Sequence, residues 1–133
     1  MEMIFDPLRR KEVALTPEER VRQWFIDLLH RDALVPLHQM SSEVPLEYAS
    51  GKKWRADIVV YGPAALPLAV VECKRPDVEI TRDVLEQALR YNAVLGVKYI
   101  FLTNGHLTYI CRRNAEGGFD FLDKAPVYSE MIK

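Results

Sequence analysis

Three charged residues lie in two short apolar segments, at positions where hydrophobic patterning would place apolar side chains. Asp57 begins the segment 56–61, and Glu72 and Lys74 end the segment 68–74. Side chains alternate between the two faces of a strand, so Glu72 and Lys74 share one face. If the two segments pair as a hairpin, both carboxylates and the ammonium group converge on one surface. The spacing therefore predicts a metal site with a lysine beside it.

Two carboxylates and a lysine suit the hydrolysis of a phosphodiester. Carboxylate oxygens are hard ligands, so Asp57 and Glu72 favour Mg²⁺ or a similar ion. A bound ion would polarise the scissile phosphate and lower the pKa of a coordinated water, which Lys74 can orient. The backbone carbonyl of Cys73 is available as a further ligand, because the Cys73 side chain points to the opposite face.

Two predicted helices flank the charged segments. Thr16 caps the first helix, which runs to about residue 30. Glu19 stands three residues after the cap, as in a capping box. Glu18 starts the buried stripe of this helix and has no such local explanation. The apolar members of the stripe are Val21, Phe25, Leu28 and Leu29.

The second helix is predicted to start after Thr81 and to end near residue 96. Gln87 and Tyr91 are four residues apart, so they lie one above the other on one helix face. Val84 and Val94 are expected on the same face, which predicts that this face is at least partly buried.

Three strands precede the second helix. A strand at 43–49 is predicted before the two charged segments, and the short turns between them imply an antiparallel meander. Pro45 favours an edge position for the first of these strands, since proline cannot donate a backbone hydrogen bond. The strand at 99–103 follows the second helix and is expected to lie parallel to the strand at 68–74 through a right-handed crossover.

The remaining strands are short. Asn104 and Gly105 predict a hairpin to the segment 107–111, and 119–122 is expected to add an edge strand. The predicted fold class is α/β, with a mixed central sheet flanked by helices.

The 133 residues predict a single domain. The segment 1–15 is interpreted as an N-terminal extension, with a solvated basic turn at 9–11, and 112–133 as a C-terminal turn and tail. The net charge of −1 means that any nucleic-acid surface must be local. Two cysteines make no disulfide framework, which favours a reducing, cytoplasmic setting. Neither a signal peptide nor a membrane-spanning run is recognised.

Five basic residues cluster near the charged segments in the sequence: Lys52, Lys53, Arg55, Arg75 and Arg82. They could contact phosphates without fixing a sequence preference. Simple solubility explains any one of them about equally well.

The charged pattern resembles a known nuclease signature. Asp57 with Glu72-Cys73-Lys74 is similar to the catalytic motif of the PD-(D/E)xK nuclease superfamily, with Ala56 where the motif has proline. Gln87 and Tyr91 match the QxxxY motif of some branches. The segments 55–59 and 71–76 most resemble the N-terminal nuclease domain of type I restriction enzyme R subunits.

The resemblance implies a restriction-endonuclease-like αβββαβ core and a DNA endonuclease site that uses Mg²⁺ or Mn²⁺. By this resemblance Asp57 and Glu72 are metal ligands and Lys74 is the catalytic lysine. Gln87 and Tyr91 are then site-supporting or DNA-facing residues, and Arg55 and Arg75 lie beside them. Glu18 is then the catalytic acid found in the first helix of many members, with the adjacent Glu19 as the alternative alignment.

Restriction R subunits continue into an ATP-driven translocase, and this chain has no phosphate-binding loop. The expected partners are therefore DNA and either restriction–modification subunits or a separate motor protein. A Glu-x-Lys pattern alone also occurs as a structural ion pair on a solvated strand. The alternative hypothesis is a non-catalytic nucleic-acid-binding or assembly module that retains the nuclease fold.

Overall fold

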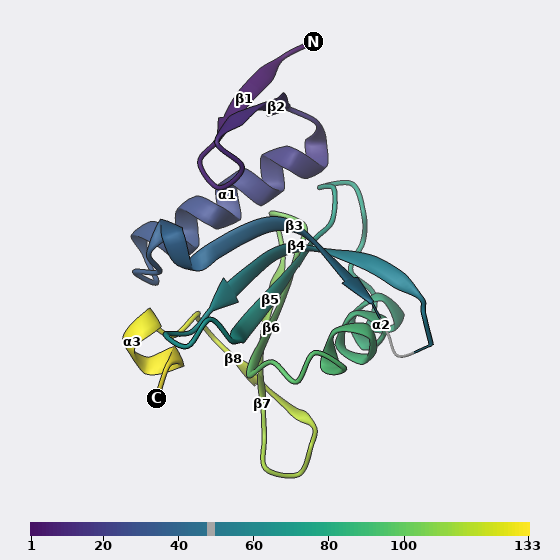
Figure 1. Cartoon of the computed structure of the whole chain (residues 1–133). Helices are drawn as coiled ribbons and strands as arrows, with labels where there is room; N and C mark the ends of the chain where they lie inside the picture. The colour runs from purple at the N-terminus through teal and green to yellow at the C-terminus, as the bar shows by residue number, and fades with distance from the viewer. Residues whose placement is uncertain (48–49) are drawn as a thin grey trace.

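A six-stranded mixed sheet forms the centre of the molecule, with a long helix on each side (Figure 1). The computed structural model describes residues 1–47 and 50–133. In chain order the elements are β1 (Met3–Asp6), β2 (Lys11–Ala14), α1 (Pro17–Arg31), a 3₁₀ turn (Leu37–Gln39), β3 (Met40–Glu47), β4 (Lys53–Tyr61), β5 (Pro67–Cys73), α2 (Arg82–Ala93), β6 (Tyr99–Thr103), β7 (Thr108–Arg113), β8 (Phe119–Leu122) and α3 (Tyr128–Met131).

The strands of the sheet follow the chain in the order β3-β4-β5-β6-β7-β8. All neighbouring pairs are antiparallel except β5 and β6, which are parallel and joined through α2. The predicted meander, the parallel pair and the edge strand at 119–122 are confirmed. β3, which contains Pro45, is an edge strand as predicted. The end of the predicted strand at Tyr48 and Ala49 lies outside the described residues.

The two faces of the sheet pack against different helices. On the α1 face the Phe25 ring meets the Phe101 ring, with 5.7 Å between centroids. On the opposite face Val70 and Ile100 are buried beneath residues that include Leu89 of α2. Because both faces of the sheet are covered, all five residues of β6 are buried, and only the last of them, Thr103, is counted as buried polar.

Helix α1 begins as its cap signals predict, and its buried stripe contains two charges. The Thr16 hydroxyl accepts a hydrogen bond of 3.1 Å from the Glu19 backbone N–H. The Glu19 carboxylate bonds Arg9, Arg22 and Gln23, so its buried position is a feature that the capping-box interpretation did not predict. The buried residues of the helix are Glu19, Val21, Arg22, Phe25, Ile26 and Leu29.

The two ends of the chain are more ordered than the sequence suggested. The segment interpreted as an extension forms the β1–β2 hairpin beside α1 (Figure 1). In the basic turn at 9–11, Arg10 and Lys11 are exposed as predicted, whereas the Arg9 side chain is only 17% exposed and pairs with Glu19. In the segment interpreted as a tail, the Tyr128 hydroxyl donates to the Tyr61 carbonyl at 2.7 Å, and Met131 is fully buried.

The predicted face of helix α2 is buried in part: Val84 and Tyr91 are partly buried, whereas Gln87 and Val94 are exposed. Val94 lies just beyond the end of the helix at Ala93. The fully buried residues of the helix are Ala88 and Asn92. Among the described residues, no helix has the length and apolar character required to cross a membrane.

Candidate active site

A cavity of about 550 Å³ lies between α1 and α2, beside β4 and the end of β5. Its lining includes almost all of the residues singled out from the sequence: Glu18, Arg55, Asp57, Glu72, Cys73, Lys74, Gln87 and Tyr91. Arg22, Glu43, Lys52, Trp54, Val84 and Ala88 complete the wall. Arg75 is not among the lining residues, and its guanidinium pairs with Asp77 at 3.3 Å.

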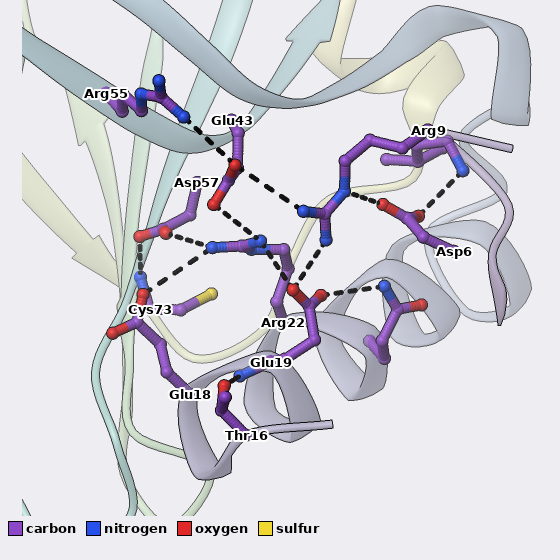
Figure 2. A network of polar contacts seen from close by, with 12 residues as sticks. Asp6, Arg9, Thr16, Glu18, Glu19, Arg22, Glu43, Arg55, Asp57 and Cys73 are labelled. Carbon is purple, nitrogen blue, oxygen red and sulfur yellow. Dashed lines mark hydrogen bonds and ion pairs between the residues drawn. The ribbon is translucent and has the colours of Figure 1, made fainter. Parts of the chain in front are cut away.

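Asp57 is held at both carboxylate oxygens. Its Oδ2 accepts a hydrogen bond of 2.7 Å from the Cys73 backbone N–H, and its Oδ1 accepts one of 3.0 Å from Arg22 (Figure 2). Burial raises the pKa of Asp57 to about 6; the Cys73 N–H and Arg22 oppose this rise, and the charge of Glu18 adds to it. Each oxygen keeps a further lone pair, so these contacts leave the carboxylate able to bind a cation.

Glu72 and Lys74 form an ion pair at the end of β5. The Lys74 ammonium lies 2.9 Å from Glu72 Oε2, and Asn92 of α2 donates to Glu72 Oε1 at 3.2 Å. The Lys74 backbone N–H donates to the Thr103 carbonyl at 2.8 Å, which fixes the chain just beyond the strand. Glu72 is thus held from the α2 side and Asp57 from the α1 side, and both line the same cavity.

The Cys73 side chain points away from the site, as predicted. It is buried in the core that α1 covers. Burial raises the pKa of the Cys73 thiol well above its ordinary value, so the thiol is not a nucleophile here.

Gln87 and Tyr91 stand on the α2 wall of the cavity. The Tyr91 hydroxyl accepts a hydrogen bond of 3.1 Å from the Lys52 ammonium, which also lies 4.9 Å from the centre of the tyrosine ring. Hydrogen bonds from Lys52 and then Gln87 lower the pKa of Tyr91. A cation, a phenol and an amide therefore meet at this border, where they could contact a phosphate backbone.

Glu18 faces the cavity and Glu19 does not. Glu18 lines the cavity, and its carboxylate lies 3.6 Å from Arg22, on the side of Asp57 (Figure 2). Glu19 is buried behind Arg22 and pairs with Arg9. The geometry therefore favours Glu18 as the first-helix acid of the site.

Sequence reasoning missed three polar residues that hold these side chains. Arg22 and Asn92 each lie on the buried face of a helix. A polar residue at a position where the helical repeat calls for an apolar one was the sequence feature that could have identified them. Glu43 contacts Arg22 at 3.4 Å and Arg55 at 3.2 Å. The Glu43 backbone has a left-handed φ of 50°. No sequence feature identifies Glu43 in advance, because a single glutamate in a weakly alternating strand is common.

The chemistry of the donor set fits a hard divalent cation. Asp57, Glu72 and Glu18 offer carboxylate oxygens to one cavity, and Cys73 adds a backbone position there. In the part of the chain that the structure describes, no three acidic, histidine or cysteine side chains are already gathered in a coordination cage. Arg22 and Lys74 currently pair with the two strand carboxylates.

Comparison with known proteins identifies a family. Residues 17–126 match the family described as the Type I restriction enzyme R protein N terminus (HSDR_N). A stretch of 78 residues is 42% identical to the type I restriction enzyme EcoAI endonuclease subunit of Escherichia coli. That stretch is 59% of this chain and only 8% of the relative.

Two solved structures are also similar. A candidate nuclease belonging to DUF820 from Anabaena variabilis ATCC 29413 matches with a TM-score of 0.56 at 12% identity, over 90% of this chain and 78% of the other, which shows the fold. A fragment of a candidate HsdR subunit of a type I restriction enzyme from Vibrio vulnificus YJ016 matches at 25% identity, with a TM-score of 0.48, over 69% of this chain and 19% of the other.

Proposed function

Since this chain belongs to the family of type I restriction enzyme R protein N termini, we propose that it is a divalent-metal-dependent DNA endonuclease module of the PD-(D/E)xK type. The observation that carries the proposal is the single cavity lined by Asp57, Glu72 and Lys74, with Glu18 at its α1 wall. Metal-assisted phosphodiester hydrolysis needs ligands for the ion, which the two carboxylates offer, and a nearby ammonium group can stabilise the charge that develops on the phosphate.

Asp57 and Glu72 would hold Mg²⁺ or Mn²⁺, with the Cys73 carbonyl as a further ligand. When bound, the ion supplies Lewis acidity to the scissile phosphate and lowers the pKa of water. Asp57 is oriented for this role by the Cys73 N–H, and Glu72 by Asn92.

Lys74 would act on the phosphate or on the attacking water. Its ammonium is partly exposed at the cavity, beside Glu72 at 2.9 Å, so it is accessible to a substrate that enters the cavity. A fixed positive charge there stabilises the charge that develops in the transition state. Lys52, Arg55 and Tyr91 would contact neighbouring phosphates, which positions DNA without reading its sequence.

The choice of where to cut is proposed to come from partners. The net charge of −1 supplies little general attraction for DNA. The family relation supports restriction–modification subunits, or a separate motor protein, as the proteins that deliver DNA to this site.

The experiment is a plasmid-nicking assay with Mg²⁺ or Mn²⁺, comparing the wild type with Glu72→Gln and Lys74→Ala. We expect each substitution to lower nicking at least 100-fold while the unfolding temperature stays near that of the wild type. Glu86→Gln is the matched control, because Glu86 is exposed on α2, pairs with Arg82 at 3.7 Å and does not line the cavity.

Two outcomes would contradict the proposal. One is a wild-type protein that neither binds Mn²⁺ nor cuts DNA when restriction–modification subunits are supplied. The other is full function of Lys74→Ala with DNA or partner binding retained, which would favour a non-catalytic assembly module.

A further inference from the structure

Arg22 is a buried cation in contact with four carboxylates. Its side chain is 4% exposed, and its guanidinium lies 3.0 Å from Asp57 and 2.9 Å from Glu19. Glu43 lies 3.4 Å away and Glu18 lies 3.6 Å away (Figure 2). Of these acids, Glu18, Glu43 and Asp57 line the cavity, and Glu19 contacts the guanidinium from outside the cavity lining.

A second cation supports this arrangement from the N-terminal hairpin. Arg9 contacts Glu19 at 2.6 Å and Glu43 at 3.6 Å, and it also pairs with the fully buried Asp6. Glu19 Oε1 accepts from Arg9 and Arg22 at once. The hairpin, which precedes the family match at residue 17, is therefore connected to Asp57 through two guanidinium groups.

The carboxylates of this network outnumber its guanidinium groups. The acids are Asp6, Glu18, Glu19, Glu43 and Asp57, and the cations are Arg9, Arg22 and Arg55. With all of them ionised, five carboxylates face three guanidinium groups, and two negative charges remain. The unbalanced charge lies beside the cavity, since Glu18, Glu43 and Asp57 all line it.

We propose that Arg22 is a positioning residue that serves as the resident counter-cation of the site: it holds Asp57 when no divalent ion is bound, and it opposes the binding of such an ion. The second part of this inference, that Arg22 opposes the binding of a divalent ion, rests on the proposed function. A fixed cation beside a carboxylate stabilises that carboxylate and repels an incoming cation by the same Coulomb interaction. Arg9 is proposed to oppose the binding of a divalent ion as well, but more weakly, because Glu19 and Arg22 lie between it and Asp57.

The first half is tested without metal, by a double-mutant cycle read as unfolding temperatures. We expect Arg22→Met to lower the unfolding temperature by at least about 5 °C, since buried carboxylates lose their partner. Asp57→Asn should be markedly more favourable in the Arg22→Met protein than in the wild type, because it removes one of the uncompensated charges. Equal effects of Asp57→Asn in the two backgrounds would overturn the counter-cation role.

The second half is tested by calorimetric titration with Mn²⁺. We expect folded Arg22→Met to bind Mn²⁺ at least fivefold more tightly than the wild type, and charge-preserving Arg22→Lys to stay within about twofold of it. Arg9→Met should shift the affinity in the same direction by a smaller factor, and it provides the test if Arg22→Met fails to fold. Arg20→Met is the matched control, because Arg20 lies on the same helix with a side chain that is 64% exposed.

Unchanged or weaker Mn²⁺ binding by folded Arg22→Met, or by Arg9→Met if Arg22→Met does not fold, would overturn the second half. A wild-type protein without Mn²⁺ affinity would count against the proposed function and would overturn this second half with it. The metal-free cycle would still decide whether Arg22 is the counter-cation of Asp57, so the two failures are distinguishable.

Discussion

Asp57 combines strong burial with hydrogen bonds that favour its charged form. Burial is the largest influence, and it raises the pKa of this carboxyl group to about 6 in spite of Arg22 and the Cys73 N–H. An aspartate in the unfolded chain titrates near 3.9. The folded protein therefore binds a proton at Asp57 in a pH range where the unfolded chain has already lost it.

This difference predicts a pH dependence of stability. Because the folded pKa lies above the unfolded one, the contribution of Asp57 to stability is lost as pH rises from about 4 to about 6. The free energy of unfolding of Asp57→Asn, relative to the wild type, should rise by roughly 2 kcal/mol between about pH 4.5 and 7. Urea denaturation of both proteins at the two pH values measures it, and a difference that does not change with pH would contradict it.

Residues at the site differ in how far the sequence predicted them. Glu72 and Lys74 were predicted because strand alternation is a local rule that two charges in an apolar segment violate. Arg22 was missed because its partners are as distant in the chain as Asp57, and a sequence pattern does not show tertiary charge contacts. Arg75 was placed near the site by proximity in sequence, but β5 ends at Cys73 and Arg75 pairs with Asp77 beyond it.

At the scale of elements, α1 carries the acid and the counter-cation to the site. Glu18 and Arg22 are four residues apart, so they lie on one face of the helix. The first turn that holds Glu18 and Glu19 is stabilised by the Thr16 cap. Helix and strand positions were predictable because caps, prolines and periodicity are local. The Arg9–Glu19 ion pair that ties the β1–β2 hairpin to α1 is a tertiary contact, which no local pattern predicts.

Loss of this cap should be measurable. Thr16→Ala leaves the Glu19 N–H without its side-chain acceptor at 3.1 Å. We expect the free energy of unfolding to fall by about 1 kcal/mol. Thr81→Ala, which removes the longer 3.3 Å cap of α2, is the comparison and should cost less. Urea denaturation measures both changes, and equal stability of Thr16→Ala and the wild type would show that the cap does not hold the first turn.

At the scale of the molecule, the sheet separates two helices that each supply part of the cavity wall. α1 delivers Glu18 and Arg22 from one face, and α2 delivers Gln87 and Tyr91 from the other. The α/β class and strand order were predictable because the crossover from β5 to β6 allows few topologies. The ion pairs that link the cavity to the N-terminal hairpin were not predictable, because they depend on how α1 packs against the rest of the fold.

The divalent ion of the proposed function would lie in this cavity, between the two strand carboxylates; this placement can be observed. It is tested most directly by a crystal of the protein soaked in Mn²⁺ and measured by anomalous diffraction. We predict an anomalous peak within coordination distance, about 2.0–2.6 Å, of carboxylate oxygens from both Asp57 and Glu72. A fully soaked crystal with no peak in the cavity, or with a peak that touches neither carboxylate, would contradict the account.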